Sequence, residues 1–222
     1  MKNPLILNFK NYMEISGEKT VELAKSAEKV SNNLGVEIIV APPQPSLWSV
    51  VQMVDIPVIC QHLDDVDVGS STGYFIPQIA KSYGSKGSLI NHSEHRVDTK
   101  SISNLVRRLK KLEMTSIVCA RTPTEVAEIA KLDPDFVAIE PSELIGSGKA
   151  ISKEAPQIIS NSLKSVNDNS DHARMVCGAG IVDKSDVSKA LQLGANGILV
   201  ASGIIKSEAW EQKISELASA FV

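Results

Sequence analysis

Short apolar runs recur along the chain, and this repetition constrains the fold more than any other feature of the sequence. The runs are nearly continuous in Val, Ile and Leu, as in strands whose two faces are both covered. Most of them are separated by a segment with helical periodicity. The eight runs are LILNF (5–9), VEIIVA (36–41), VICQ (58–61), SLIN (88–91), SIVCA (116–120), FVAIE (136–140), RMVCG (174–178) and GILVA (197–201).

Strands that alternate with helices predict right-handed βαβ units and a parallel sheet. The helical segments include 17–35, 122–133 and 184–194, several with a capping residue at the start and Gly or Asp near the end. Eight units fit a closed α/β barrel, a (β/α)8 barrel, in which several helices must be short. No linker interrupts the pattern, so we expect a single domain over 1–222. A doubly wound open sheet remains the alternative, because periodicity does not prove closure.

The charge balance argues against a nucleic-acid partner. The formal net charge is −3, and apolar residues make up 43% of the chain, as in an ordinary globular protein. One basic cluster, RRLKK (107–111), lies in a periodic segment whose apolar residues share one helical face. We therefore expect these charges on a solvated face, with an anion or partner site as the alternative.

Neither a membrane span nor a secretory signal is expected. No window approaches the ~18 consecutive apolar residues of a span, and the N-terminal MKNPLILNFKN has the wrong flank for a signal peptide. The sequence thus predicts a cytoplasmic protein without a membrane partner. Its three cysteines, Cys60, Cys119 and Cys177, lie in or at the end of apolar runs and are expected to be reduced core thiols.

Polar side chains stand where several of the predicted strands end. Asn8 and Lys10 close the first run, His92 and Glu94 follow the fourth, and Glu140 ends the sixth. The carboxyl ends of barrel strands meet on one face, which would bring an amine, an imidazole and a carboxylate together. Singly, each has a plainer interpretation: a surface lysine, a capping or core histidine, and a carboxylate that begins a helix.

Glycine-rich turns follow the last two predicted strands. CGAGI (177–181) and VASG (200–203) allow backbone amides to approach an anion, and barrels commonly bind phosphate after these strands. After the sixth strand, IEPSELIGSGK (139–149) combines a proline with two glycines, which indicates a loop with a rigid start and a mobile end.

The remaining histidines are weaker candidates for a site. His62 follows the third run, and His95 and His172 lie in polar surroundings. No pair of histidines or cysteines has the spacing of metal ligands, so no metal is expected.

Five motifs, each after a predicted strand and all in one order, resemble the triosephosphate isomerase family. The forms NFK and NHSE, where many relatives carry NWK and GHSE, and the short length resemble the archaeal branch, which tends toward tetramers. The motifs are NFKNY (8–12), LINHSEHR (89–96), IEPSELIGSGK (139–149), CGAGI (177–181) and ILVASGI (198–204).

The resemblance implies a TIM barrel that interconverts dihydroxyacetone phosphate and D-glyceraldehyde 3-phosphate in glycolysis and gluconeogenesis. The reaction passes through an enediolate and needs no cofactor. The partners implied are a small phosphorylated triose and further copies of the chain, as a homo-oligomer that is a tetramer or a dimer.

The resemblance also implies roles for individual residues. Glu140 would be the base, and His92 the electrophile, held neutral at a helix N-terminus predicted within 93–98. Lys10 would place a positive charge near the phosphate and the enediolate, with Asn8 nearby and Glu94 holding Lys10. The phosphate would be bound mainly by backbone amides at Ile145, Gly146, Gly180, Ala201 and Ser202.

The loop departs from the family pattern at one place. Many relatives carry a tryptophan after the proline, whereas this chain has Ser142, Glu143 and Leu144, so Glu143 adds a charge beside the hinge. Two other functions stay open: a different phosphate-binding barrel enzyme with the same glycine-rich turns, and a non-catalytic barrel that acts as a scaffold. The joint presence of a lysine, a histidine and a glutamate at strand ends favours the isomerase.

Overall fold

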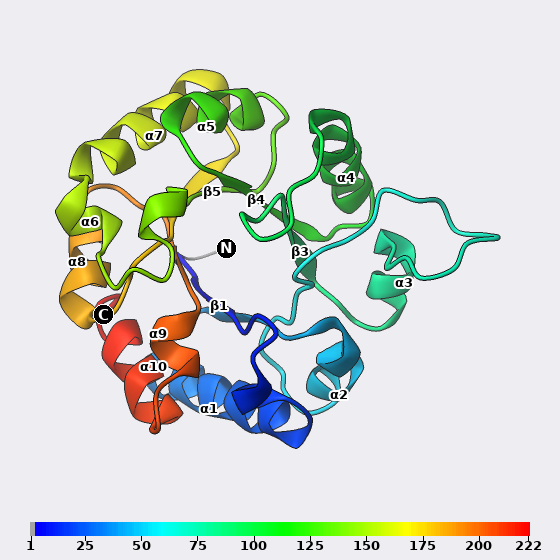
Figure 1. Ribbon diagram of the computed structural model, residues 1–222, viewed down its shortest axis with the longest axis horizontal. Helices are drawn as coiled ribbons and strands as arrows, with labels where there is room; N and C mark the ends of the chain where they lie inside the picture. Colours follow the sequence, from blue (N-terminus) through cyan, green and yellow to red (C-terminus); the bar gives the residue numbers. More distant parts are fainter. Residues whose placement is uncertain (1–2) are drawn as a thin grey trace.

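The computed structural model describes residues 3–222 as a parallel sheet surrounded by helices (Figure 1). Seven strands form one sheet in the order β2-β1-β7-β6-β5-β4-β3, with all pairs parallel. The strands are β1 (Leu5–Asn8), β2 (Ile38–Ala41), β3 (Gly87–Ile90), β4 (Thr115–Ala120), β5 (Phe136–Ile139), β6 (Arg174–Cys177) and β7 (Ile198–Val200).

Residues 58–60 join the two outer strands, β2 and β3, and so close the sheet. On one side, the Ile59 N–H donates to the Val40 carbonyl oxygen at 2.9 Å. On the other, the Cys60 N–H donates to the Gly87 carbonyl oxygen, also at 2.9 Å. The barrel prediction is therefore confirmed, and the open doubly wound sheet is excluded.

The expected third strand, 58–61, is the one run that does not form a full strand. It makes one isolated bridge to β2 and one to β3. Pro57 precedes it and has no N–H to extend the pairing. At its end the side chain of Gln61 donates to the carbonyl oxygens of Ala41, the last residue of β2, and of Lys10, which follows β1. The count of eight strands is corrected to seven plus this bridging segment.

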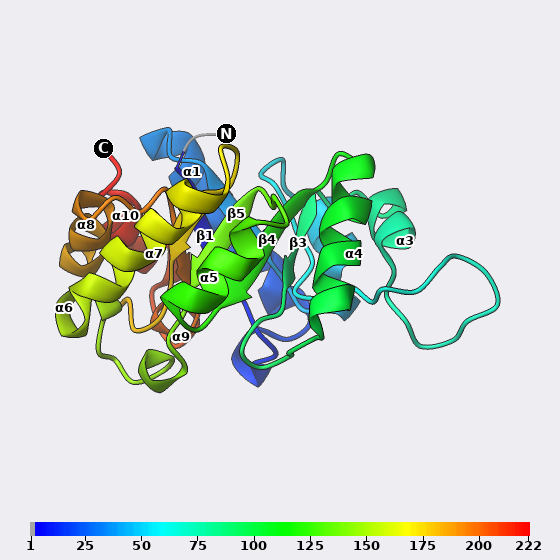
Figure 2. The same cartoon turned by 90° about the horizontal axis from the view of Figure 1, so that it is seen from above.

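The helices lie outside the sheet, as Figures 1 and 2 show from two directions. Several are short, as predicted, although three exceed twelve residues. The α-helices are α1 (Glu18–Leu34), α2 (Leu47–Val51), α3 (Pro77–Ser82), α4 (Thr99–Lys111), α5 (Pro123–Ala130), α6 (Ile151–Glu154), α7 (Pro156–Asn169), α8 (Lys184–Gln192), α9 (Ser202–Ile205) and α10 (Trp210–Ala218). Single 3-10 turns are η1 (Met13–Ile15), η2 (Gln44–Ser46) and η3 (Ser142–Leu144).

The first helix illustrates how the sequence sets these elements. Leu23, Ala27 and Val30 recur at helical spacing and are buried against the sheet. The helix ends at Gly35, which adopts the left-handed conformation with φ 66° and donates its N–H to the Ser31 carbonyl oxygen at 2.9 Å. Glycine reaches this conformation without a Cβ clash, so α1 stops where the sequence predicts.

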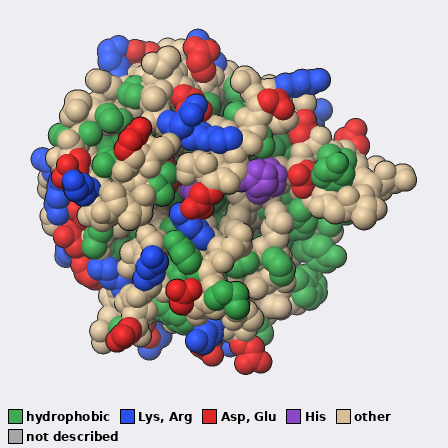
Figure 3. Space-filling view, viewed as in Figure 1, with side chains coloured by type: hydrophobic (Ala, Val, Ile, Leu, Met, Phe, Trp, Pro, Cys, Tyr) green, Lys and Arg blue, Asp and Glu red, His purple; other side chains and the backbone are tan. Residues whose placement is uncertain are grey.

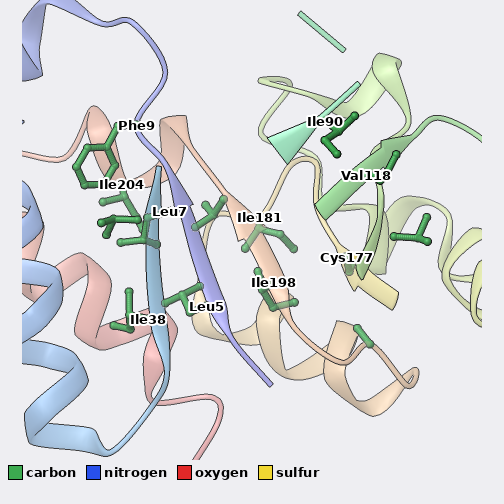
Figure 4. Close-up of a cluster of buried hydrophobic side chains, with 14 of the residues drawn as sticks. Leu5, Leu7, Phe9, Ile38, Ile90, Val118, Cys177, Ile181, Ile198 and Ile204 are labelled. Carbon is green, nitrogen blue, oxygen red and sulfur yellow. The ribbon is translucent and has the colours of Figure 1, made fainter. Parts of the chain in front are cut away.

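Strand residues alternate between two apolar layers. Leu5 and Leu7 point outward and pack with the residues beneath the helices, as Figure 4 shows, whereas Ile6 belongs to a separate cluster inside the barrel. Burial of each such side chain stabilises the fold by roughly 1.5–3 kcal/mol. The interior cluster consists of Ile6, Ile39, Ala41, Ile59, Leu89, Ile117, Cys119, Phe136, Ala138, Val176 and Leu199.

The same alternation decides which strand-end residues face the mouth of the barrel. Asn8 lies two residues after Ile6, and Glu140 two residues after Ala138, so both continue interior columns. Their side chains therefore emerge at the carboxyl end of the sheet.

Arg108 is the exception to the prediction that the RRLKK cluster lies on a solvated face, which holds for the exposed Arg107, Lys110 and Lys111. Its side chain is only 16% exposed, and its guanidinium pairs with Asp65 at 3.0 Å. It also donates to the carbonyl oxygen of Val66 at 2.6 Å and to the side chain of Gln78 at 2.9 Å. Arg108 thus anchors the base of the loop 61–76, which projects from the barrel in Figure 2. Helical periodicity cannot show that a distant loop covers the polar face.

Within residues 3–222, no helix is long and apolar enough to cross a membrane.

Candidate active site

A cavity of about 180 Å³ opens at the carboxyl ends of the strands. This volume is below the roughly 300–1,000 Å³ typical of drug-sized ligands and suits a smaller molecule. Figure 3 looks onto this face, where exposed histidine atoms (purple) lie close to acidic and basic side chains near the centre. Nine of the ten predicted site residues line the cavity: Asn8, Lys10, His92, Glu140, Ile145, Gly146, Gly180, Ala201 and Ser202.

Glu140 is held directly after β5 as a buried carboxylate. Its backbone N–H donates to the Ala120 carbonyl oxygen at 2.8 Å, and its side chain is 8% exposed. Among the described residues, its Oε2 has no hydrogen-bond partner. Gly178 packs against the other side, because a Cβ there would lie 2.7 Å from Cγ and Oε1 of Glu140. One carboxylate oxygen is therefore fixed in place and free to accept a proton.

The His92 ring lies next to this carboxylate. Its Nε2 is 3.5 Å from Glu140 Oε2, and its Nδ1 accepts the backbone N–H of Glu94 at 3.2 Å. A ring nitrogen that accepts an N–H carries no proton, so the proton of the neutral ring is on Nε2, facing Glu140.

The predicted helix N-terminus at His92 is wrong. The helix α4 begins only at Thr99, where Asp98 caps it by accepting the Ser101 N–H. His92 instead begins a turn in which its carbonyl oxygen accepts the His95 N–H at 2.8 Å. The His92 ring therefore meets the single backbone N–H of Glu94 rather than the N-terminus of a helix.

Asn91 shapes the turn that presents His92. It adopts the left-handed conformation with φ 60°, which Asn tolerates better than most residues because its short side chain bonds locally. Its Nδ2 donates to the Cys119 carbonyl oxygen at 3.0 Å, and its Oδ1 accepts the Val97 N–H at 3.2 Å. These bonds tie the turn to β4.

Lys10 also occupies a left-handed conformation, with φ 51°. Such a backbone costs roughly 1–2 kcal/mol for a residue with a Cβ. Its N–H donates to Asn8 Oδ1 at 3.0 Å, its carbonyl oxygen accepts from Gln61 at 3.0 Å, and its Nζ pairs with Glu94 Oε1 at 2.6 Å. Glu94 lies beside the cavity and bonds to both Lys10 and His92.

Two residues near the cavity were missed by the sequence reasoning. Gln61 bonds to the carbonyl oxygens of both Lys10 and Ala41, at 3.0 Å each. It ends the third apolar run, so the strand-end rule that found Asn8 would have found it too. Lys206 lines the cavity with its Nζ 5.7 Å from the centre of the Tyr12 ring. The sequence carries no pattern that singles out Lys206.

The three cysteines are free and buried, as predicted. Burial raises the pKa of the Cys119 and Cys177 thiols, and the nearby charge of Glu140 raises it further. Burial also raises the pKa of Cys60 to about 12, against a smaller lowering by its bond to Ser85. All three stay protonated at neutral pH and are poor nucleophiles.

The other side of the cavity is formed by loops. Gly146 and Gly180 have φ of 70°, and a Cβ on Gly180 would collide with the Lys149 carbonyl oxygen. The helix α9 begins at Ser202, where the first backbone N–H groups have no intrahelical acceptor. These are the features that let backbone amides bind an anion.

Residues 142–149 form a lid that is largely exposed and bonded to itself. The Ile145 N–H donates to the Ser142 carbonyl oxygen at 3.4 Å, and Ser147 Oγ donates to the Leu144 carbonyl oxygen at 2.8 Å. Glu143 is exposed to water. The Ile145 amide therefore already has an acceptor within the lid.

The other histidines lie outside the smaller cavity. His62 and His95 stack with ring centres 3.7 Å apart beside a neighbouring cavity of about 760 Å³, and His62 Nε2 is 3.4 Å from Asp64. Burial lowers the pKa of His62, and the His95 charge lowers it further. His172 lies 3.4 Å from Asp135. In the part of the chain that is described, no three His, Cys, Asp or Glu side chains are arranged to hold a metal.

Comparison with known proteins gives one consistent family. The family model for triosephosphate isomerase matches residues 4–217. The chain is 46% identical to a triosephosphate isomerase of Methanothermus fervidus, with 98% of each chain covered. It is 45% identical to those of Cenarchaeum symbiosum, covering 97% of this chain and 96% of the relative, and Caldivirga maquilingensis, covering 100% and 99%.

Proposed function

The chain belongs to the triosephosphate isomerase family, and from this premise we propose which of its residues perform the reaction. The enzyme interconverts dihydroxyacetone phosphate and D-glyceraldehyde 3-phosphate, a step of glycolysis. The reaction moves a proton between adjacent carbons, so it requires a base, a group that polarises a carbonyl, and a site that retains the phosphate.

Glu140 is the proposed base. It removes the carbon-bound proton and returns it to the neighbouring carbon, through an enediolate. Support comes from its burial and its unpartnered Oε2, since a base works best when it is fixed and kept from water. Gly178 leaves just enough room for the carboxylate and so limits its movement.

His92 is the proposed electrophile. Because Nδ1 accepts the Glu94 N–H, Nε2 carries a proton that it can donate to the substrate carbonyl oxygen. A neutral imidazole that gives this proton and takes another from the adjacent hydroxyl moves protons between the two oxygens. The 3.5 Å separation from Glu140 allows both groups to reach neighbouring atoms of one small substrate.

Lys10 is the proposed fixed positive charge near the phosphate and the enediolate oxygens. Its side chain is 13% exposed and its ammonium is paired with Glu94, which limits its motion. Asn8 fixes the backbone of Lys10 and adds a hydrogen-bonding group at the cavity wall. A cation held in advance stabilises developing negative charge without reorganisation during the reaction.

The phosphate is proposed to bind to backbone amides on the loop side of the cavity. Two glycines with positive φ and the start of α9 support this assignment. Closure of the lid over the phosphate would exclude water, which protects the enediolate from elimination. The residues proposed are Ile145, Gly146, Gly180, Ala201 and Ser202.

The observation that carries the proposal is that Lys10, His92 and Glu140 line one small cavity with the glycine-rich turns. A coupled NADH assay with D-glyceraldehyde 3-phosphate tests it. The Glu140→Gln variant, purified identically, is the control, because it reveals any isomerase carried over from the host. Folded wild-type protein without turnover, or a variant as active as wild type, would overturn the assignment.

We further propose that residues 1–222 act as one catalytic domain in the cytoplasm, as a homotetramer or homodimer. Several large apolar side chains are exposed, including Val68 and Tyr74 in the loop 61–76. Exposed apolar patches often mark subunit contacts. Light scattering that gives the 23.9 kDa mass of a single chain would contradict the oligomer. The exposed residues are Met13, Trp48, Val68, Tyr74, Ile79 and Tyr83.

A further inference from the structure

The segment that follows the lid is fastened to α8 by a short ion pair. Lys153, in α6, places its Nζ 2.6 Å from Asp186 Oδ1. The Asp186 side chain is 3% exposed, whereas that of Lys153 is 50% exposed. Figures 1 and 2 both show α6 next to α8, with the lid leading into α6.

The same carboxylate also holds the turn that follows β6. Its Oδ2 accepts the backbone N–H of Val182 at 2.9 Å and that of Asp183 at 3.2 Å. Asp183 in turn accepts the Asp186 N–H at 2.8 Å, which completes a capping box at the start of α8. One buried carboxylate therefore accepts hydrogen bonds from the cavity-lining turn with one oxygen and forms an ion pair with the segment after the lid through the other.

Close backbone packing joins the same two segments. The Ile151 N–H donates to the Ala179 carbonyl oxygen at 3.4 Å, and Ser152 Oγ donates to the Asp186 carbonyl oxygen at 3.1 Å. At Gly180 the backbones of the two segments approach so closely that any side chain there would overlap the Lys149 carbonyl oxygen. The end of the lid and the turn 178–182 thus form one packed unit.

We propose that Lys153 and Asp186 are positioning residues of the isomerase, which lock the end of the lid to the phosphate-binding turn. This inference rests on the proposed function. The lid carries the amides of Ile145 and Gly146, and the turn carries that of Gly180, so the ion pair sets the distance between the two halves of the phosphate site. Neither side chain lines the cavity itself.

The charges favour a role beyond capping. An uncharged Gln can serve the third helical position of a capping box, which Asp186 occupies, whereas a buried carboxylate is costly unless a cation compensates it. Lys153 supplies that cation, and its bond to Asp186 raises the pKa of the ammonium. Asp183 adds a second acidic group 3.5 Å from the same ammonium.

The test compares Lys153→Met with Lys164→Met. Lys164 also pairs with an aspartate, Asp168, but is 75% exposed on α7. We expect Lys153→Met to raise KM for D-glyceraldehyde 3-phosphate and Kd for inorganic phosphate about threefold to tenfold, the effect of 0.6–1.4 kcal/mol. We expect turnover of unphosphorylated D-glyceraldehyde to change less than twofold, since that substrate does not use the phosphate site. The control variant should match wild type in all three measurements.

The ratio of kcat/KM values for the two substrates does not depend on the fraction of folded enzyme, so partial unfolding cannot imitate the effect. Lys153→Arg should restore the ratio, and Asp186→Asn should lower it as Lys153→Met does. An unchanged ratio and phosphate Kd in Lys153→Met, or equal losses with both substrates, would overturn the proposal. Wild-type protein that binds phosphate without isomerising either substrate would instead refute the proposed function.

Discussion

The two sides of the cavity are built in opposite ways. Glu140 and His92 are 6% and 7% exposed. Glu140 directly follows β5 and His92 follows β3 after one residue, and each is bonded to its surroundings. The lid residues 146–149 are exposed and held mainly by one another. Side chains therefore supply the groups on the first side, whereas backbone amides supply them on the second.

This difference follows from what each side must do. Proton transfer tolerates little displacement, since an error of about 1 Å can cost roughly 100-fold in rate. Phosphate binding must admit the substrate, close and release the product, which requires segments with few buried contacts. The barrel satisfies both demands by placing Glu140, the proposed base, directly after β5 and the lid shortly after it.

The strongest test of the rigid side is Glu140→Asp. Shortening the side chain retracts the carboxylate while keeping its charge, so we expect kcat to fall by about 10²–10⁴-fold. The Kd of phosphoglycolate, measured by its effect on Tm, should change little because the phosphate amides are intact. A variant within twofold of wild type in kcat would show that the base is elsewhere.

Gly178→Ala tests the same side without altering a polar group. The added Cβ must displace the Glu140 carboxylate, from which it would otherwise be 2.7 Å. We expect kcat/KM to fall about 100-fold. Gly17→Ala is the control for the cost of a Gly→Ala change. A Cβ at Gly17 meets no atom within 4 Å, although the φ of 65° there strains alanine. If both variants lose only stability, Gly178 does not position the base.

Gln61→Met removes two hydrogen bonds while keeping the size of the side chain. The carbonyl oxygen of Lys10 loses its Gln61 donor, at a cost of about 1–3 kcal/mol, whereas that of Ala41 keeps the Phe9 N–H at 3.0 Å. We expect a loss of about 10-fold in kcat/KM and a lower Tm, because the strained Lys10 backbone is less well held. The control is Gln192→Met, whose side chain is exposed on α8, and it should change neither kcat/KM nor Tm. Equal behaviour of the two variants would show that Gln61 does not support Lys10.

The smallest expected effect concerns pH and the stacked histidines next to the rigid side. Burial and the His95 charge lower the pKa of His62 in the folded protein, against smaller raising effects of Asp64. As pH falls through about 6.5, His62 therefore takes up a proton in the unfolded chain before it does so in the folded protein. This contribution of His62 to the stability of the fold is present above that pH and is lost below it.

Thermal melts between pH 7.5 and 5.5 measure this loss. We expect Tm to fall by no more than about 2–4 °C, the shift that ~1 kcal/mol produces in a chain of this size. His62→Asn should flatten the dependence. A wild-type Tm that rises toward pH 5.5, or an unchanged slope in the variant, would contradict the role of His62.

The strand-end residues were predictable because parallel strands in a barrel share one functional face. Asn8, Lys10, His92 and Glu140 needed only the apolar runs and that rule. The contacts of Arg108 were not predictable, since they depend on a loop forty residues away along the chain.

The helix boundary at His92 failed for a local reason. Residues 93–98 contain acceptable helix-start residues, but Asp98 provides a cap closer to the apolar face of α4. The turn that results depends on Asn91 in a left-handed conformation, which the sequence indicates only weakly. The lid and its attachment through Lys153 and Asp186 lay outside any strand-end pattern.

The bridging segment 58–60 also bears on how the barrel opens. Its single bridges contrast with the four residue pairs that join β1 to β2, so it is a weak seam of the closed sheet, like the single residue pair that joins β6 to β7. Amide hydrogen exchange begins where the fewest buried bonds must break, and we expect it to be faster at Ile59 and Cys60 than along β5. Gln61, which follows the seam, bonds to the Lys10 carbonyl. Each local opening of the seam would therefore also break the hydrogen bond from Gln61 that supports the Lys10 backbone. Opening of the barrel at this segment and loss of this support for Lys10 are expected to occur together.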